Sequence, residues 1–240
     1  MTFLYDYIGA HDAATYDLEN AIADPERRIE GFIESLIPFE GAALADIGAG
    51  SGFHACLYAQ KAARVFAVEP APKMLGQLYA RVAGSGLRNV SVLVAAADEI
   101  PLRADLLDVV HVRFAYFFGP EQGTVRSCEP GIREALRILK PGGFFFIVDN
   151  ALTTGQFAGI LARFGYTKGQ AEQMQQRNDA FYASHGFDHT TVESTWTAPD
   201  RASLRRVMAM EFSGQPTDEI MAEIEGSELS YHYRVYYRRK

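Results

Sequence analysis

The chain has 240 residues, of which 48% are hydrophobic and 22% are charged, a balance that suits one globular domain with a full core. Its formal net charge of −7 argues against broad attraction to nucleic acid or to an anionic membrane surface. No stretch has the length and apolarity of a membrane span and the first residues have no basic start, so we expect a soluble cytoplasmic protein. The two cysteines, Cys56 and Cys128, match no metal or redox spacing, and we expect buried apolar residues rather than a disulfide.

The first 38 residues predict a helical cap in front of the fold. Residues 1–23 are rich in Tyr, Asp and Ala. Asp24 followed by Pro25 is a typical helix start, with the acid as the cap and the proline at the first helical position. Apolar residues then recur at helical spacing until Pro38.

Residues 39–150 alternate between apolar strands and helices, which predicts a cofactor-binding α/β core. Strands are expected at 42–47, 65–68, 89–94, 107–112 and 144–148, and helices at 54–63, 70–82 and 132–139. Fully apolar strands joined by helices form a parallel sheet that helices cover on both faces. Right-handed crossovers then bring the carboxyl ends of the strands, and a ligand site with them, to one edge of the sheet.

Residues 151–240 are expected to complete the same single domain, with a helical insertion and final antiparallel strands. Helices are predicted at 154–164, 171–184, 200–211 and 216–224, and strands at 187–197 and 229–238. In the last strand, aromatic and aliphatic residues alternate with polar ones, which is typical of an antiparallel strand with one solvated face.

A glycine-rich turn, Asp46-Ile47-Gly48-Ala49-Gly50-Ser51-Gly52, follows the first apolar strand and opens the next helix. Glycine has no Cβ, so such a turn can bend sharply and let a ligand touch the backbone. The dinucleotide fingerprint G-x-G-x-x-G would require glycine at position 53, where this chain has Phe53. Glu69 ends the next apolar run, and a carboxylate there can accept both hydroxyls of a ribose.

The spacing D-x-G-x-G-x-G resembles motif I of the class I S-adenosylmethionine-dependent methyltransferases. A second match, REALRILKPGG over residues 133–143, supports the resemblance, which covers about residues 25–150. The resemblance implies a Rossmann-like seven-stranded mixed sheet in the order 3-2-1-4-5-7-6, with the seventh strand antiparallel and helices on both faces. It also implies S-adenosylmethionine as the cofactor and S-adenosylhomocysteine as the product.

The same resemblance implies roles for individual residues. Asp46 would face the ammonium of the cofactor, Glu69 would bind its ribose, and Asp98 would accept a hydrogen bond from its adenine amino group. The full cofactor-binding set is Asp46, Gly48, Ala49, Gly50, Gly52, Glu69, Pro70, Met74, Ala97, Asp98, Glu99 and Arg113. Plainer interpretations stay open: a solvated turn acid for Glu69, a loop acid for Asp98 and a core residue for Met74. We also expect Glu69 to contribute little to the stability of the ligand-free fold.

The methyl acceptor is expected over the carboxyl ends of the strands, beside Tyr16, Phe114 and Tyr116, although each ring could equally pack a long loop. The pair Asp149-Asn150 occurs in metal-dependent catechol-type O-methyltransferases. Their other metal acid should follow the fourth strand, near the place where this chain has the cationic Arg113, so we expect no metal. His111 lies within an apolar strand and is interpreted as a core histidine, and no catalytic base is assigned.

These features predict methyl transfer to a small-molecule acceptor by direct displacement, as in the group that includes quinone-biosynthesis methyltransferases. The alternatives are an RNA or protein methyltransferase, and a non-catalytic S-adenosylmethionine-binding protein of the same fold. The acidic balance argues against RNA. The intact glycines and Asp46 argue against a non-catalytic protein, and Phe53 argues against a nicotinamide-dependent oxidoreductase.

Overall fold

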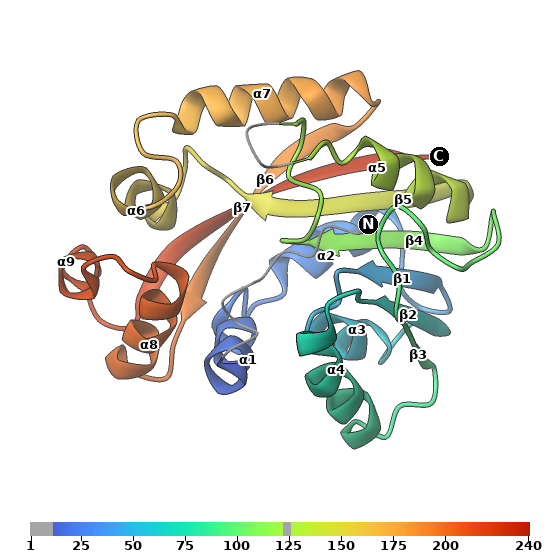
Figure 1. Ribbon diagram of the computed structural model, residues 1–240, viewed down its shortest axis with the longest axis horizontal. Helices are drawn as coiled ribbons and strands as arrows, with labels where there is room; N and C mark the ends of the chain where they lie inside the picture. Colours follow the sequence, from blue (N-terminus) through green and yellow to red (C-terminus); the bar gives the residue numbers. More distant parts are fainter. Residues whose placement is uncertain (1–11, 122–125) are drawn as a thin grey trace.

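The computed structural model describes residues 12–121 and 126–240, and a seven-stranded sheet runs through its centre (Figure 1). The strands lie in the order β3-β2-β1-β4-β5-β7-β6. The first five are parallel, and β7 is antiparallel to both of its neighbours, which confirms the predicted order and the reversed last strand. Their bounds are β1 Ala43–Ile47, β2 Arg64–Val68, β3 Val90–Leu93, β4 Leu107–Arg113, β5 Leu139–Asn150, β6 Asp188–Thr197 and β7 Glu228–Arg239.

Helices cover both faces of the sheet, as predicted. On one face Ala45 and Val110 pack with buried residues of α5 and α7, and on the other Leu44 and Val109 pack with buried residues of α2, α3 and α4. Successive side chains of a strand point to opposite faces, so these strands are apolar throughout. The helices are α1 Ala13–Ile22, α2 Arg28–Leu36, α3 Phe53–Tyr58, α4 Pro72–Gly84, α5 Glu129–Ile138, α6 Gln156–Phe164, α7 Ala171–Ser184, α8 Arg201–Glu211 and α9 Thr217–Ala222.

The predicted helix start at Asp24 and Pro25 is wrong by a few residues. Helix α2 begins at Arg28, because Arg27 before it adopts a left-handed backbone with φ of 56°. Asp24 still caps the helix, since its carboxylate accepts from the backbone N–H groups of Arg28 (3.1 Å) and Ile29 (2.9 Å). Asp24 therefore lies four residues before the helix, and its carboxylate pairs backbone N–H groups of the first helical turn that have no partner within the helix.

The segment Lys140-Pro141-Gly142-Gly143, which follows the helix predicted over 132–139, belongs to a strand. Helix α5 ends at Ile138, Leu139 is already extended, and β5 begins at once. Gly142 does have a left-handed backbone, with φ of 86°, but its N–H donates to the carbonyl of Lys240 (2.8 Å). The turn thus joins the start of β5 to the end of β7.

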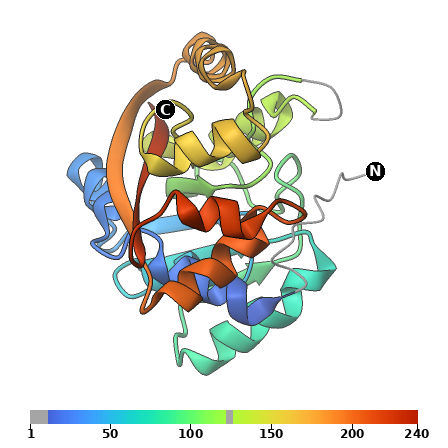
Figure 2. The same ribbon diagram turned by 90° about the vertical axis from the view of Figure 1, so that its left-hand side faces the viewer.

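The carboxyl ends of the parallel strands point towards α1, α6, α8 and α9 (Figure 1). Helix α1 packs against α8, and the two lie side by side in the second view (Figure 2). A late helix of the chain and its first described helix therefore meet over the same edge of the sheet. Within the described residues, no helix is long and apolar enough to cross a membrane.

Candidate active site

The glycine turn after β1 has the backbone that only glycine adopts readily. Gly48, Gly50 and Gly52 have φ angles of 75°, 55° and 80°, in the left-handed region. The N–H groups of Gly48 and Ala49 both donate to the carbonyl of Val68 at the end of β2, at 2.8 Å and 3.0 Å. The turn is therefore anchored to the neighbouring strand, and Gly52 leads directly into α3.

The space around these glycines is also restricted. A Cβ on Gly48 would collide with the Cβ of Ala115, and one on Gly50 would lie 2.6 Å from the hydroxyl oxygen of Tyr16. Real Cβ atoms do not approach other atoms so closely. The structure thus brings Tyr16, predicted as an acceptor contact, against the centre of the predicted cofactor turn.

Glu69 follows β2 and holds the glycine turn with both carboxylate oxygens. Its Oε2 accepts from the N–H of Gly50 and its Oε1 from the N–H of Ala71, each at 2.8 Å. The side chain is buried, which raises the pKa of its carboxyl, and the two backbone donors offset part of that rise. The sequence-based expectation was that Glu69 contributes little to the ligand-free fold, but these two bonds lead us to expect that removing the acid lowers stability.

Asp46 is a second buried acid beside the turn. Only 3% of the residue is exposed, and its charge adds to the rise in the pKa of Glu69. Two buried acids beside one turn give this part of the interior a negative character, which favours a cationic ligand. Ser51, in the same turn, has a buried hydroxyl without a hydrogen-bond partner among the described residues. A cationic, hydroxyl-rich molecule such as S-adenosylmethionine fits this combination of two acids, a glycine backbone without side chains and an unpaired hydroxyl.

The other predicted cofactor residues surround this turn unevenly. Met74 lies in the first turn of α4 and is 5% exposed, in keeping with either a cofactor contact or a core position. Ala49 and Ala97 are buried, and Pro70 is half-buried directly after Glu69. Asp98 and Glu99, in the loop after β3, are exposed and open to a ligand at this edge.

Arg113 is the last residue of β4 rather than the first after it, and its side chain enters a buried polar cluster. Its Nη1 lies 3.0 Å from Nε2 of His54 and 4.0 Å from Oε1 of Glu30, and its guanidinium lies over the ring of Tyr233. Burial and the charge of Arg113 lower the pKa of His54 well below its ordinary value. The neutral His54 ring therefore accepts a hydrogen bond from Arg113.

Helix α1 is fastened over the turn by a residue that the sequence does not reveal. Arg81 of α4 donates from Nε to the carbonyl of Ser51 (3.0 Å) and from Nη2 to Asp17 of α1 (2.5 Å). Two residues earlier in α1, the hydroxyl of Thr15 accepts a hydrogen bond from Arg206 of α8 (3.1 Å). No spacing in the sequence marks Arg81, because its partners come from two distant segments.

The two acceptor candidates after β4 lie on opposite faces of the sheet. Phe114 is 40% exposed and its ring lies 6.1 Å from that of Tyr233 and 6.4 Å from that of Tyr231. Tyr116 instead packs against Gly131 of α5 and the ring of Phe117. Phe114 thus belongs with the aromatic residues of β7, and Tyr116 does not.

An aromatic cluster that the sequence analysis missed lies beside Phe114. Tyr231 stacks on Trp196 with ring centroids 4.6 Å apart, and the indole N–H of Trp196 donates to the hydroxyl of Tyr233 (3.2 Å). Tyr231 also donates to the side-chain oxygen of Asn150 at the end of β5. The alternation of aromatic and polar residues in β7 indicates in the sequence that these rings share one face. The contact with Trp196 depends on the pairing of β6 with β7, which the sequence does not show.

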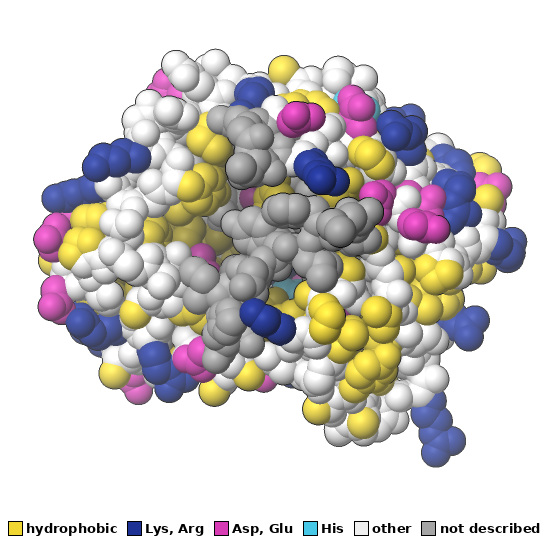
Figure 3. All heavy atoms as spheres, in the orientation of Figure 1, with side chains coloured by type: hydrophobic (Ala, Val, Ile, Leu, Met, Phe, Trp, Pro, Cys, Tyr) yellow, Lys and Arg dark blue, Asp and Glu magenta, His cyan; other side chains and the backbone are white. Residues whose placement is uncertain are grey.

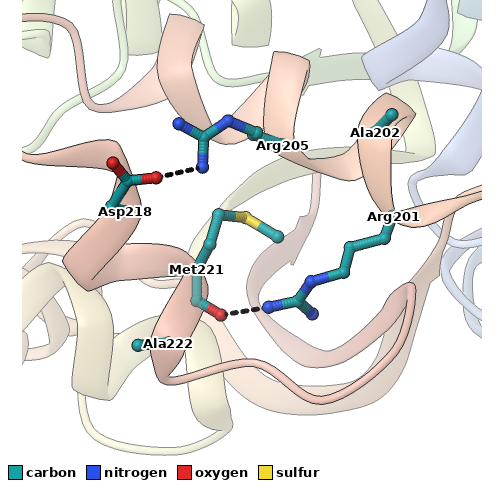
Figure 4. A pocket seen from close by; sticks show the side chains of 6 residues that line it. All are labelled: Arg201, Ala202, Arg205, Asp218, Met221 and Ala222. Carbon is teal, nitrogen blue, oxygen red and sulfur yellow. Dashed lines mark hydrogen bonds and ion pairs between the residues drawn. The ribbon is translucent and has the colours of Figure 1, made fainter.

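A shallow pocket between α8 and α9 is a poor candidate for the chemistry (Figure 4). Arg201 donates to the carbonyl of Met221 (2.6 Å), and Arg205 pairs with Asp218 (2.6 Å), so both cations already have partners. Its lining residues are Arg201, Ala202, Arg205, Asp218, Met221 and Ala222. None of them belongs to the glycine turn or to the strand ends.

Asp149, at the end of β5, is a half-buried acid whose burial raises the pKa of its carboxyl to about 6. Its Oδ1 accepts from the N–H of Asn150 at 2.7 Å, which offsets part of the rise. Across residues 12–121 and 126–240, no group of three His, Cys, Asp or Glu side chains is placed to hold a metal ion.

We expect Asp149→Asn to stabilise the protein at pH 8 and to leave its stability unchanged near pH 4. The folded state binds the Asp149 proton more tightly than the unfolded state, so this acid costs stability as pH rises from about 4 to about 6. Removing the charge should recover about 1–2 kcal/mol at pH 8, a value discounted because water reaches part of the side chain. Urea unfolding of both proteins at the two pH values measures this, with the exposed Asp188→Asn as the control. A gain of equal size at both pH values would contradict the assignment.

Comparisons with known proteins agree with this geometry. Residues 45–147 match the model of the methyltransferase domain family. An uncharacterized methyltransferase of Mycobacterium tuberculosis is 32% identical over 119 residues, which is 49% of this chain and 44% of that protein. A ubiquinone biosynthesis O-methyltransferase of Paracidovorax citrulli is 32% identical over 121 residues, 48% of this chain and 47% of that protein. The chain thus matches about half the length of these curated relatives.

The fold has solved counterparts over almost its whole length. The crystal structure of a SAM-dependent methyltransferase from Aquifex aeolicus superposes with a TM-score of 0.57 at 17% identity and covers 94% of this chain and 96% of that one. At this identity the likeness concerns the fold alone. The domain match, the sheet order and the glycine turn with its two acids all agree. Residues 45–147 therefore carry a methyltransferase domain, and the sheet order and glycine turn around it are those of the class I S-adenosylmethionine-dependent fold that the motifs predict.

Proposed function

We propose that this protein transfers the methyl group of S-adenosylmethionine to a small-molecule acceptor by direct displacement. The observation that carries the proposal is the left-handed glycine turn held by the buried Glu69 and flanked by the buried Asp46. Such a site offers carboxylates to the ribose hydroxyls and the ammonium, and open backbone to the rest of the molecule.

The chain's own residues have a limited task in this reaction. The cofactor supplies a methyl group on a sulfonium, which is already a good leaving group. The protein must hold both reactants in line and exclude water. Tyr16 and the rest of α1 support this role, because α1 is fastened over the turn through Arg81 and Arg206. A general base is needed only if the acceptor must lose a proton.

An aromatic or otherwise planar small molecule fits the acceptor side. The rings of Phe114, Tyr231, Tyr233 and Trp196 gather where the carboxyl ends of β4, β5 and β6 meet the amino end of β7, beside α1. Aromatic side chains favour planar, apolar partners. The similarity to a protein named a ubiquinone biosynthesis O-methyltransferase supports this class of acceptor.

The surface gives little support to the alternative, an RNA methyltransferase. The net charge is −7, and on the face seen in Figure 3 the Lys and Arg side chains are scattered among acidic ones. An RNA-binding surface would gather them into a continuous patch that neutralises phosphates.

We expect the purified protein to bind S-adenosylhomocysteine and S-adenosylmethionine but not NAD. Phe53 replaces the third fingerprint glycine, and α3 therefore begins differently from a dinucleotide-binding helix. Calorimetric titration with all three compounds is the measurement. Binding of NAD together with no response to either adenosyl compound would refute the proposal.

A methyl-transfer screen against a metabolite library, read by mass spectrometry, then tests the acceptor class. A methylated aromatic small molecule is the expected product. Binding of the cofactor with no product from any small molecule, but with a methylated RNA or protein, would favour the alternative acceptors. Binding with no product of any kind would favour a non-catalytic binding protein.

A further inference from the structure

Three buried polar side chains form a continuous hydrogen-bonded chain behind the glycine turn. Asp46 of β1 and His111 of β4 are register partners on adjacent strands, and both side chains point to the face that α3 covers. Oδ1 of Asp46 lies 3.0 Å from Nδ1 of His111. The hydroxyl of Tyr58, in α3, lies 3.1 Å from Nε2 of the same histidine and 3.4 Å from its Nδ1. These residues are 3%, 0% and 1% exposed.

The partners fix which ring nitrogen carries the proton. An ionised carboxylate only accepts, so the bond to Asp46 requires a proton on Nδ1 of His111. Nε2 is then free to accept from Tyr58, whose hydroxyl keeps its proton because burial raises the pKa of that tyrosine well above its ordinary value. Tyr58 thus orients the ring, and the ring donates a charge-assisted hydrogen bond to Asp46.

This bond uses only one oxygen of Asp46. Within residues 12–121 and 126–240, Oδ2 accepts no hydrogen bond. The rotation of a carboxylate about its last bond is soft, so a single short donor on one oxygen also sets the direction in which the other oxygen points. The residue two positions further along the chain is Gly48, the first glycine of the turn.

We propose that His111 is a positioning residue that holds Asp46 so that its free oxygen faces the ammonium of the cofactor. The inference rests on the proposed function, because it presumes that S-adenosylmethionine binds at the glycine turn. It replaces the interpretation of His111 as a plain core histidine. A plain core histidine would need only some hydrogen-bond partner for each ring nitrogen. Here the partner of Nδ1 is Asp46, an acid of the predicted cofactor site.

A comparison of two ligands tests this role. S-adenosylhomocysteine carries the ammonium, and 5′-methylthioadenosine has the same adenosine but lacks the amino-acid end. His111→Leu removes the donor to Asp46. It should weaken the binding of S-adenosylhomocysteine about tenfold, while the affinity for 5′-methylthioadenosine changes less than about twofold. His111→Asn should restore most of the lost affinity, because its amide nitrogen takes the place of Nδ1. Both constants come from calorimetry, with ligand-free melting temperatures beside them.

The outcomes separate this inference from the proposed function. Equal weakening of both ligands, or no weakening of either, would overturn the positioning role while wild-type binding still supports the proposed function. A wild-type protein that binds neither ligand would refute the proposed function itself. If the leucine variant does not fold, Tyr58→Phe removes one hydroxyl only and should weaken S-adenosylhomocysteine about threefold, with 5′-methylthioadenosine unchanged. A Tyr58→Phe protein with unchanged affinity for both would also overturn the inference.

Discussion

Gly50→Val should abolish measurable binding of S-adenosylhomocysteine, a loss of at least about a hundredfold, while the protein still folds. Gly50 has φ of 55°, which a β-branched residue resists, and its N–H must reach Oε2 of Glu69. The new side chain would fill the space where the ligand approaches the backbone and would press on the hydroxyl of Tyr16. The measurement is calorimetric titration together with circular dichroism of the ligand-free variant.

Gly86→Val is the matched control for this substitution. Gly86 also has a left-handed backbone, with φ of 71°, but it is exposed and a Cβ there would meet nothing within 4 Å. Backbone strain should cost each variant about 1–2 kcal/mol of stability, and Gly50→Val should lose more because its side chain also presses on Tyr16. Only the variant in the glycine turn should lose the ligand. A folded Gly50→Val protein with wild-type affinity would show that the turn does not hold the cofactor.

Glu69→Ala should weaken S-adenosylhomocysteine by roughly tenfold to several hundredfold. A carboxylate that accepts from two ribose hydroxyls makes two charge-assisted hydrogen bonds, each contributing about 1.5–3 kcal/mol, and water recovers part of the loss. The substitution should also lower the ligand-free melting temperature by several degrees, because the N–H groups of Gly50 and Ala71 lose their buried acceptor. Titration and thermal melting of the same samples give both numbers.

Glu69→Gln and Glu40→Ala sharpen the test. The glutamine side chain has one acceptor oxygen, so its amide group must face one of the two backbone N–H groups with a donor of its own. The Glu69→Gln protein should therefore bind the ligand better than Glu69→Ala but melt at a lower temperature than the wild type. Glu40 is exposed, and its loss removes the same charge without touching the turn. A Glu69→Ala protein with a lower melting temperature but unchanged affinity would make the acid purely structural.

Much of the fold could be predicted because the pattern that marks each element is local. The helix over 171–184 was predicted with its bounds, and the strand at 107–112 is β4 with one residue added. The helix predicted at 54–63 is shorter in the structure. It is α3, which ends at Tyr58, because the chain must turn back before β2 begins at Arg64. The sheet order came from the resemblance alone, because strand pairing depends on residues far apart in the chain.

The site could be predicted only where its chemistry is contiguous. The glycines and Glu69 lie in or directly after apolar runs, and their spacing carried the assignment. Arg81 and the link between His111 and Asp46 had no such signal, since each contact joins separate elements. Closeness in the sequence was misleading for Tyr116 and Phe114, which were predicted to contact the same acceptor. Both residues have left-handed backbones, with φ of 26° at Tyr116 and 48° at Phe114, and their rings lie on opposite faces of the sheet.

The position of β7 between β5 and β6 sets the order in which the sheet can assemble. The five parallel strands precede β6 and β7 in the chain, so during synthesis this part of the sheet can pair first. Strand β6 pairs with β7 alone and therefore has no partner in the sheet until β7 has formed. Together β6 and β7 bring Trp196 and Tyr231 to the acceptor edge. A slow-folding or newly made chain would thus acquire its cofactor turn before its acceptor side, and the exposed β6 would be its main point of misassociation.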